Sequence, residues 1–318
     1  MIYLVTGSAG FIGFHTAKRL LEKKNIVIGV DNLNRYYDPK LKLARNKILK
    51  KYKKYKFHKI DISNKKKIDK LFKKEKVDVV INLAAQAGVR YSIINPSTYI
   101  KSNLNGFFNI IQNCVEYKVK KLIFASSSSI YGVNKNPKFK ESFITDSPIQ
   151  LYAATKKSNE LIAHSYSSLF DLKCIGLRFF TVYGPWGRPD MSLFKFVKNI
   201  KKKKHIEIYN QGNHLRDFTY IDDCVSGIIN TLNYKMKKKF EIFNIGSEKP
   251  IKLINFIKII EDYLKIKAKK KFLGLQMGDT IRTSASISKI SKATGYKPKT
   301  SIKKGVHNFI NWYNDFYR

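Results

Sequence analysis

Short apolar runs alternate with longer segments of helical character over the first 180 residues. The runs predict strands at residues 2–6, 26–30, 56–60, 77–83, 121–125 and 174–179. Between them, helices are expected after residue 13, at 40–51, from near 64, at 97–118 and at 151–170. Strands that alternate with helices in this way predict an α/β fold, a doubly wound parallel sheet with helices on both faces.

The pattern changes after Phe180, where turn-forming residues become frequent. Residues 181–189 are turn-rich, residues 212–218 and 244–247 are further loops, and 221–232 has the character of a helix. The basic stretch 265–271 is either a surface segment or a strand. We therefore expect a first domain at 1–180, with a return segment near 217–246, and a smaller α/β substrate-binding lobe at 181–318.

Composition narrows the class of protein without changing this picture. The chain has 318 residues, 43% of them hydrophobic, which is enough for a sizeable core. It has no apolar run long enough to cross a bilayer and no start resembling a signal peptide, so no membrane insertion is expected. Three scattered cysteines predict reduced thiols in a cytoplasmic protein. Six histidines without ligand spacing predict no metal site.

The charge is strongly basic, with 62 Lys and Arg against 23 Asp and Glu, a net +39. Such a balance often indicates a nucleic-acid partner. The densest lysine runs, however, are scattered, at 50–54, 201–204 and 237–239, and they lie within or beside predicted helices. We interpret them as solvated faces and expect no specific nucleic-acid partner.

Glycines at the first strand–helix junction predict a dinucleotide site. Gly7 permits the tight turn, Gly10 lets the backbone approach a pyrophosphate, and Gly13 allows close helix–strand packing. The pyrophosphate would then meet free N–H groups at the helix N-terminus.

An acid ends the second predicted strand, which bears on the choice of cofactor. Asp31 lies 18 residues after Gly13, where a carboxylate binds ribose hydroxyls and repels a 2′-phosphate. This favours NAD over NADP, although Arg35 is nearby. Asp61 ends the next strand, and either contacts the adenine or caps the helix that begins near Asn64.

A tyrosine and a lysine four residues apart carry the candidate chemistry. On a helix, Tyr152 and Lys156 leave the same face. Because a free tyrosine has a pKa of about 10, it needs a nearby cation to act as a base at neutral pH. We expect the Lys156 ammonium and a cationic nicotinamide ring to supply that charge, and Ser127, in the serine run 126–129, to hold the reacting oxygen.

These motifs together resemble a known family over the whole chain. The chain is similar to extended short-chain dehydrogenase/reductases of the nucleotide-sugar epimerase group, and within it to UDP-glucuronate 4-epimerases. The matching segments are residues 6–13, 30–38, 61–62, 84–92, 126–132, 152–156, 178–190 and 216–223. It departs from the group at Asn82, where many relatives have histidine, and at 276–279, which lacks an arginine that often precedes Pro-Gly-Asp.

The resemblance implies roles for individual residues. NAD would be held by Gly7, Gly10, Phe11, Ile12, Gly13, Asp31, Asn32, Asp61, Ile62, Leu83, Ala84, Ala85, Asn103, Tyr152, Lys156 and Phe179. The catalytic group would be Ser127, Tyr152 and Lys156. The nucleotide sugar would be bound by Arg90, Ser127, Ser128, Ser129, Tyr152, Thr181, Arg188, Arg216 and Asp279, with Arg188, Thr181, Ser128, Ser129 and Arg90 as candidates to hold a sugar carboxylate.

Several of these residues also have a purely structural interpretation. Asn103 suits a helix-turn cap, Phe179 the core, Arg188 a surface loop, Arg216 a pair with Asp217, and Asp279 a turn cap.

The resemblance implies an NAD-dependent UDP-sugar 4-epimerase that acts through a transient 4-keto sugar. The implied substrate is UDP-glucuronate, which would be converted to UDP-galacturonate. The resemblance also implies a homodimer that assembles through helices 97–118 and 151–170. A UDP-glucose 4-epimerase is the nearest alternative. A nucleotide- or nucleic-acid-binding protein without catalysis is an alternative of another class. Related dehydratases and decarboxylases carry an extra acid at the serine run, where this chain has Ser128 and Ser129.

Overall fold

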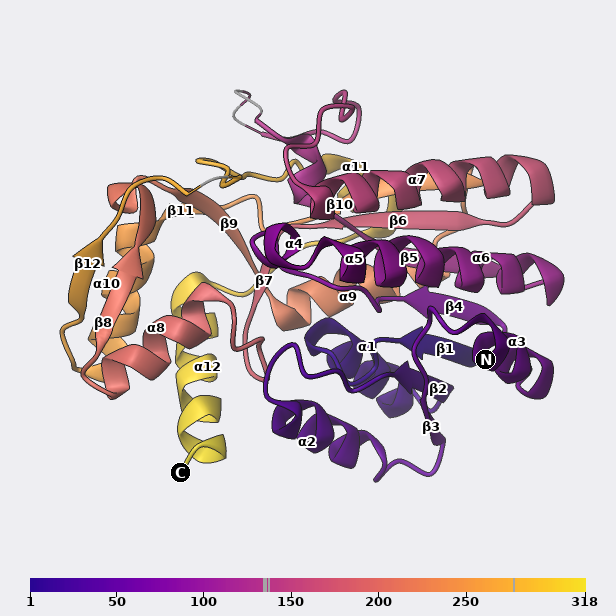
Figure 1. Cartoon of the computed structure of the whole chain (residues 1–318), viewed down its shortest axis with the longest axis horizontal. Coiled ribbons are helices and arrows are strands. Elements are labelled where there is room, and N and C mark those ends of the chain that lie inside the picture. The colour runs from indigo at the N-terminus through magenta and orange to yellow at the C-terminus, as the bar shows by residue number, and fades with distance from the viewer. Residues whose placement is uncertain (134–135, 137, 277) are drawn as a thin grey trace.

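A seven-stranded parallel sheet forms the centre of the molecule (Figure 1). The computed structural model describes residues 1–133, 136, 138–276 and 278–318. Met277, which belongs to the departure at 276–279, lies outside the described residues. The strand order is β10-β6-β5-β4-β1-β2-β3. The strands are β1 Ile2–Thr6, β2 Ile26–Asp31, β3 Tyr55–Lys59, β4 Val79–Asn82, β5 Lys121–Ser127, β6 Cys174–Phe179 and β10 Phe240–Ile245.

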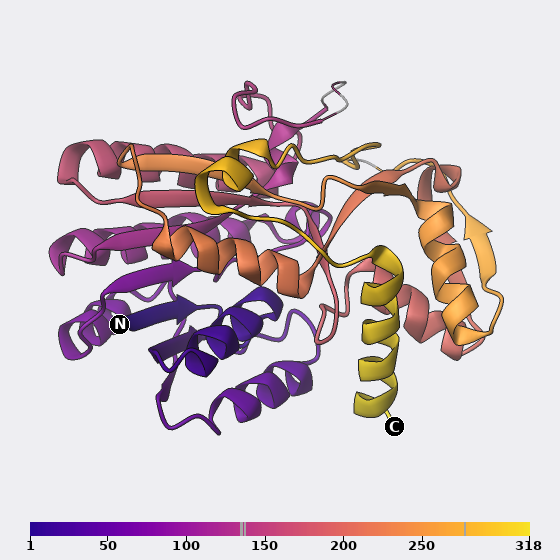
Figure 2. The ribbon, with the colours of Figure 1, turned by 180° about the vertical axis from the view of Figure 1, so that it is seen from behind.

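Helices cover both faces of this sheet (Figures 1 and 2). One face carries α3 Lys65–Lys74, α6 Gly106–Glu116 and α7 Leu151–Phe170, and the other carries α1 Phe11–Glu22, α2 Pro39–Leu49 and α9 Ile221–Asn233. Neighbouring strand residues therefore enter different cores: Leu4 packs in the cluster of α3 and α6, and Val5 in that of α1. Burial on both sides explains why the strands are continuous apolar runs.

The position of β1 in the sheet, between β2 and β4, decides where a ligand can bind. Strand β1 pairs with β2 on one side and β4 on the other, with Thr6 beside Val30 and Asn82. The chain continues from β1 to β2 on one side of β1 and later crosses from β3 to β4 on the other side. This change of direction opens a crevice at the carboxyl ends of β1 and β4. The predicted parallel doubly wound sheet is confirmed.

The second lobe lies beside the carboxyl ends of the sheet. Its strands form a three-stranded sheet, β11-β9-β7, and a two-stranded sheet, β12-β8. The elements are β7 Thr181–Tyr183, α8 Ser192–Lys201, β8 His205–Ile208, β9 Leu215–Tyr220, β11 Pro250–Lys252, α10 Leu253–Leu264, β12 Lys269–Phe272 and α12 Ile302–Phe316. Helix α11 Ser288–Thr294 instead packs against α9 and β10 of the first domain. Residues 269–272 are thus a strand, one of the two alternatives that the sequence left open.

The long helix expected at 97–118 is divided. Short helices α4 Tyr91–Ile94 and α5 Pro96–Tyr99 precede a π-helical turn, Ile100–Asn105, and then α6. Pro96 begins a new helix because it cannot donate a hydrogen bond to the preceding turn. No helix in the described part of the chain has both the length and the apolar character needed to cross a membrane.

Candidate functional site

The turn between β1 and α1 is shaped by its glycines. Gly7 has φ +69°, and a Cβ on it would lie 2.9 Å from the Ala84 nitrogen. A Cβ on Gly13 would lie 2.0 Å from the Gly7 carbonyl oxygen, and the Gly10 amide donates to that same oxygen at 2.9 Å. No side chain caps the start of α1, so its first N–H groups face the cleft. The observed backbone therefore fits the pyrophosphate of a dinucleotide.

The acid that ends β2 is buried beside this turn. Asp31 accepts hydrogen bonds from the Ala9 amide at 3.2 Å and the Leu33 amide at 2.8 Å, and burial raises the pKa of its carboxyl. Lys42, which donates to the Asn34 carbonyl at 2.9 Å, adds a cation that the sequence analysis missed. Arg35 is exposed and lies outside the cleft wall, so it does not weaken the preference for NAD.

Asp61 faces the same part of the cleft. It accepts hydrogen bonds from Ser63 at 2.7 Å and from the Asn32 side chain at 3.1 Å. Burial alone would raise its pKa, but these hydrogen bonds hold the pKa below its usual value. The helix cap is Asn64, whose side chain accepts from the Lys67 amide at 3.1 Å, so Asp61 is free of that role.

The catalytic candidates converge where β5 ends against α7. Lys156 donates to the Ala125 carbonyl at 2.9 Å, and burial lowers the pKa of its ammonium to about 8. Burial raises the pKa of the Tyr152 phenol, and the Ser127 hydroxyl and the Arg188 charge oppose that rise. The Arg188 charge is thus a cation acting on Tyr152 that the sequence analysis did not assign to this role.

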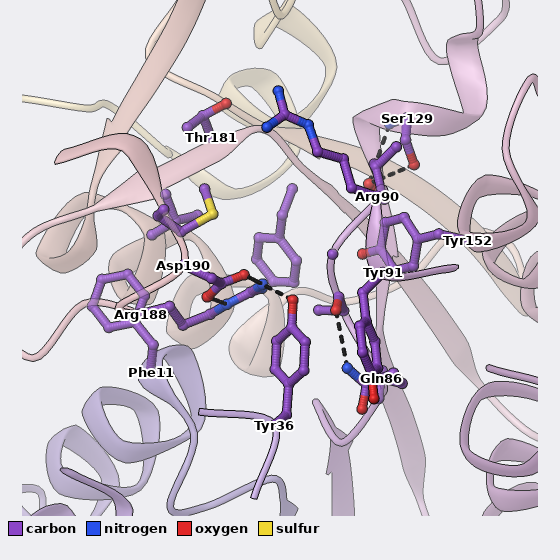
Figure 3. A pocket seen from close by; sticks show the side chains of 18 of the residues that line it. Phe11, Tyr36, Gln86, Arg90, Tyr91, Ser129, Tyr152, Thr181, Arg188 and Asp190 are labelled. Carbon is purple, nitrogen blue, oxygen red and sulfur yellow. Dashed lines mark hydrogen bonds and ion pairs between the residues drawn. The ribbon is translucent and has the colours of Figure 1, made fainter. Parts of the chain in front are cut away.

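The serine run presents a chain of hydroxyls beside Tyr152. Ser129 donates to the Ser127 oxygen at 2.9 Å, and its amide approaches the same atom at 3.2 Å. Figure 3 shows Ser129 and Tyr152 on one wall of the cleft and Thr181 on the opposite side. A sugar between these walls would meet neutral donors and acceptors on both sides.

Arg188 lies in the wall of the cleft, not in a surface loop. Its Nε donates to Asp190 Oδ1 at 3.0 Å and its Nη2 to Oδ2 at 2.5 Å. Tyr36 donates to Asp190 Oδ2 at 3.1 Å, so Asp190 lies between the two side chains (Figure 3). The predicted carboxylate-binding arginine is therefore already neutralised. The sequence analysis missed Asp190 and Tyr36; an acid two residues after Arg188 was the available signal.

The loop that carries Arg188 is anchored by the dinucleotide domain. His15 Nε2 donates to the Pro185 carbonyl at 3.0 Å. Arg45 is fully buried and donates to the Trp186 carbonyl at 2.5 Å and, through its other terminal nitrogen, to the Ala9 carbonyl at 2.9 Å. The guanidinium of Arg45 thus holds both the glycine turn and the loop that carries Arg188.

Arg90, Arg216 and Asp279 gather at the outer part of the cleft. Arg90 pairs with Asp279 at 3.4 Å and lies 4.3 Å above the ring of Tyr209, in the second lobe. Arg216 donates to the Ile281 carbonyl at 2.9 Å. Asp217 instead accepts from Ser247 and neighbouring amides, so the alternative Arg216–Asp217 pair does not form.

One cleft of about 1190 Å³ collects nearly all these residues. Every predicted site residue lines it except Asn103, which is buried behind the wall and holds the Gln86 backbone through hydrogen bonds of 2.8 and 3.0 Å. Gln86, in the matching segment 84–92, also lines the cleft. Further lining residues come from segments that carried no sequence signal: Lys42, Gln150, Lys195, Asn199, His205, Glu207 and Tyr209.

Comparison with known proteins agrees with this geometry. An uncharacterized protein of Methanocaldococcus jannaschii is 53% identical over 98% of this chain and 95% of its own. A probable UDP-glucuronate 4-epimerase of Rhizobium meliloti is 42% identical over 100% of this chain and 98% of its own.

A solved structure of UDP-glucuronic acid 4-epimerase from Bacillus cereus, in complex with UDP-glucuronic acid and NAD, superposes with a TM-score of 0.95 at 33% identity over 100% of both chains. The model of the NAD dependent epimerase/dehydratase family matches residues 3–246. The chain therefore belongs to the NAD dependent epimerase/dehydratase family.

Proposed function

We propose that this protein is an NAD-dependent UDP-sugar 4-epimerase that interconverts UDP-glucuronate and UDP-galacturonate. The observation that carries the proposal is the convergence of Ser127, Tyr152 and Lys156 with the glycine turn in one cleft. The names of the Rhizobium meliloti and Bacillus cereus relatives support the uronate as the sugar.

The protein's part in the reaction is proton transfer and orientation. NAD, bound around the glycine turn, would supply the hydride acceptor and donor for C4 of the sugar. Tyr152 accepts the proton of the C4 hydroxyl and later gives it back. Ser127 hydrogen-bonds the same oxygen, and Lys156 lies one helical turn from Tyr152 with its amine held by the Ala125 carbonyl.

The cofactor roles proposed for Gly7, Gly10, Gly13, Asp31 and Asp61 follow from their places around the cleft. Asn103 has a supporting role instead, because it holds the segment that includes Gln86 from behind the wall.

The sugar carboxylate requires restraint, because the 4-keto uronate is a β-keto acid that can lose CO2. We assign this restraint to the hydroxyls of Ser128, Ser129 and Thr181, with Arg188 nearby. Neutral hydrogen bonds hold the carboxylate while letting the keto sugar turn over between the two hydride transfers.

A UDP-glucose 4-epimerase is the second candidate. The bidentate pair of Arg188 with Asp190 leaves this wall without net charge, which a neutral hexose tolerates. A UDP-glucose 4-epimerase from Thermotoga maritima superposes with a TM-score of 0.91 at 27% identity.

Purified protein incubated with a panel of UDP-sugars, with products read by NMR, tests both candidates. We expect UDP-glucuronate to yield UDP-galacturonate much faster than UDP-glucose yields UDP-galactose. The reverse preference would select the second candidate. If the NAD-loaded protein turned over none of these sugars, the result would favour a binding protein without catalytic activity.

We also propose a homodimer through α6 and α7. Their outer faces expose Phe108, Leu161, Leu169 and Phe170, apolar side chains that a partner helix pair would cover. Sedimentation should give a dimer for the unaltered chain and a monomer for Leu161→Lys. A monomeric unaltered chain would contradict the proposal. The division at residue 180 and the cytoplasmic location stay predictions.

A further inference from the structure

Asp190 holds an unusual place for an acid in a cleft expected to receive an anionic sugar. Its two oxygens take the Nε and Nη2 donors of Arg188, and Tyr36 donates to one of them. The side chains of Arg188 and Asp190 are only 22% and 25% exposed, so water screens the pair poorly. Ser128, Ser129 and Thr181 can hold the sugar carboxylate without an acid at position 190.

We propose that Asp190 is a specificity-determining residue that masks Arg188 and limits its grip on the sugar carboxylate. The proposal rests on the proposed uronate substrate. A guanidinium binds a carboxylate best through two parallel N–H donors. Asp190 already occupies one such pair, so a uronate carboxylate would have to share the guanidinium with a second negative charge.

Tyr36 keeps Asp190 in this position. It comes from the loop after β2, and burial, followed by the Asp190 charge, raises the pKa of its phenol to about 12. The phenol is therefore a permanent donor at neutral pH. Asp190 is held by Arg188 on one side and Tyr36 on the other, from segments more than 150 positions apart in the chain.

Masking explains how one cleft can hold a uronate and still release it. If Arg188 were unpaired, it would bind the carboxylate firmly and keep the 4-keto sugar in one orientation. With Asp190 in place, the serine and threonine hydroxyls carry most of the hold. Arg188 still faces the reacting centre, since it lines the cleft together with Tyr152 and its charge opposes the rise that burial causes in the pKa of the Tyr152 phenol.

The test measures binding to NAD-loaded protein in a Tyr152→Phe background, which keeps the ligands from turning over. Asp190→Asn keeps the shape and a hydrogen-bond acceptor but removes the charge. Because the unmasked guanidinium can give the sugar carboxylate two charge-assisted hydrogen bonds, we expect UDP-glucuronate to bind about 10-fold or more tightly. The affinity for UDP-glucose should stay within about 2-fold, which also reports correct folding.

Two controls locate the effect. Adding Arg188→Ala to Asp190→Asn should abolish the gain, because no guanidinium is left to expose. Asp279→Asn removes the same charge from the outer part of the cleft, where Asp279 pairs with Arg90, and should change both sugars alike.

Weaker uronate binding by Asp190→Asn would overturn the proposal, since Asp190 would then position Arg188 for the carboxylate. Equal changes for both sugars would overturn it as well. A separate measurement tests the proposed function, which would be wrong if the unaltered protein did not epimerise UDP-glucuronate.

Discussion

Burial has opposite effects on the two side chains that the spacing of Tyr152 and Lys156 brings together. It raises the pKa of the phenol and lowers that of the ammonium to about 8. Both shifts favour the neutral forms, so the protein alone does not make Tyr152 a strong base. During turnover, the cationic ring of the bound cofactor and the Arg188 charge would favour the phenolate form of Tyr152.

Replacing Tyr152 by phenylalanine tests the proposed base. The ring keeps its packing against Tyr99 but loses the phenolic hydroxyl, which is the only base proposed for the C4 proton. We expect turnover of UDP-glucuronate to be abolished while NAD stays bound, measured by NMR and by cofactor content after gel filtration. Retention of more than about a few per cent of activity would exclude Tyr152, since a proton-transfer group contributes about 10²–10⁴-fold.

Lys156 should make stability depend on pH. The unfolded ammonium keeps its proton up to about 10.5, whereas the folded one loses it near 8, so the unfolded chain binds more protons between these values. Stability from this group therefore rises with pH across that window. At pH 7 the buried ammonium should cost about 3 kcal/mol, offset by about 1 kcal/mol from its hydrogen bond.

Lys156→Met should thus unfold at higher urea than the unaltered protein at pH 7, while losing turnover. The gap in the free energy of unfolding should close as pH approaches 10. A gap that is independent of pH would show that Lys156 is not titrating in the folded protein.

Residue types and spacing were enough to single out the glycine turn, the acid after β2, Tyr152 and Lys156, which line one cleft. They did not reveal which groups neutralise one another. Asp190 pairs with Arg188, and Asp279 with Arg90 across 189 positions. The Arg90–Asp279 pair depends on how separate loops approach each other in space, which local pattern does not encode, whereas the Arg188–Asp190 pair lies within one loop and its spacing was readable in the sequence.

Elements with strong apolar patterns were predicted almost to the residue, and those governed by tertiary contacts were not. Helix α7 and strand β6 begin and end where expected. The helix expected at 97–118 is divided because Ile100–Asn105, which includes Asn103, forms a π-helical turn. In that turn Asn103 holds Gln86, a long-range contact that outweighs regular helical geometry.

The loop before Arg188 depends on α1 and α2 rather than on its own sequence. Trp186 has φ +61°, a left-handed conformation that is costly for a residue with a Cβ. His15 and Arg45 hold the carbonyls on either side of it. The dinucleotide domain thereby sets the position of the substrate-facing arginine.

Arg45→Met should disturb this loop. It would leave the Ala9 and Trp186 carbonyls without their buried donor, at about 1–3 kcal/mol each, so we expect the free energy of unfolding to fall by about 2–6 kcal/mol. KM for UDP-glucuronate should rise, because Arg188 follows the loop. Lys24→Met, which removes an exposed cation, serves as the matched control. Unchanged stability and KM would show that the loop holds its own shape.

At the scale of the whole molecule, the cleft is shared by both lobes. The first lobe could be predicted from alternating strands and helices, whereas the second showed mostly turns and loops. Its strands β7 and β8 have only three and four residues, too short for periodicity to be distinguished from chance. Consequently the lining residues His205, Glu207 and Tyr209 emerged only from the structure.

The net charge of +39 belongs to the whole surface rather than to one site. The lysine runs lie after α2, after α8 and before β10, three separate places in the fold. None of these runs lines the cleft. We therefore expect binding to duplex DNA to be weak and to fade steeply between about 50 and 200 mM salt, as counterion release requires.

Fluorescence anisotropy with duplexes of unrelated sequence would measure this binding. We expect similar affinities for all sequences and no competition with UDP-glucuronate beyond what ionic strength explains, because the duplex would touch scattered lysines outside the cleft. The variant Lys201→Gln/Lys202→Gln should lower the salt slope slightly without changing turnover, since these two exposed residues lie outside the cleft wall. Nanomolar binding that prefers one sequence and survives about 200 mM salt would contradict this interpretation, since purely phosphate-directed contacts cannot produce it. The basic surface would then have to be assigned a function of its own.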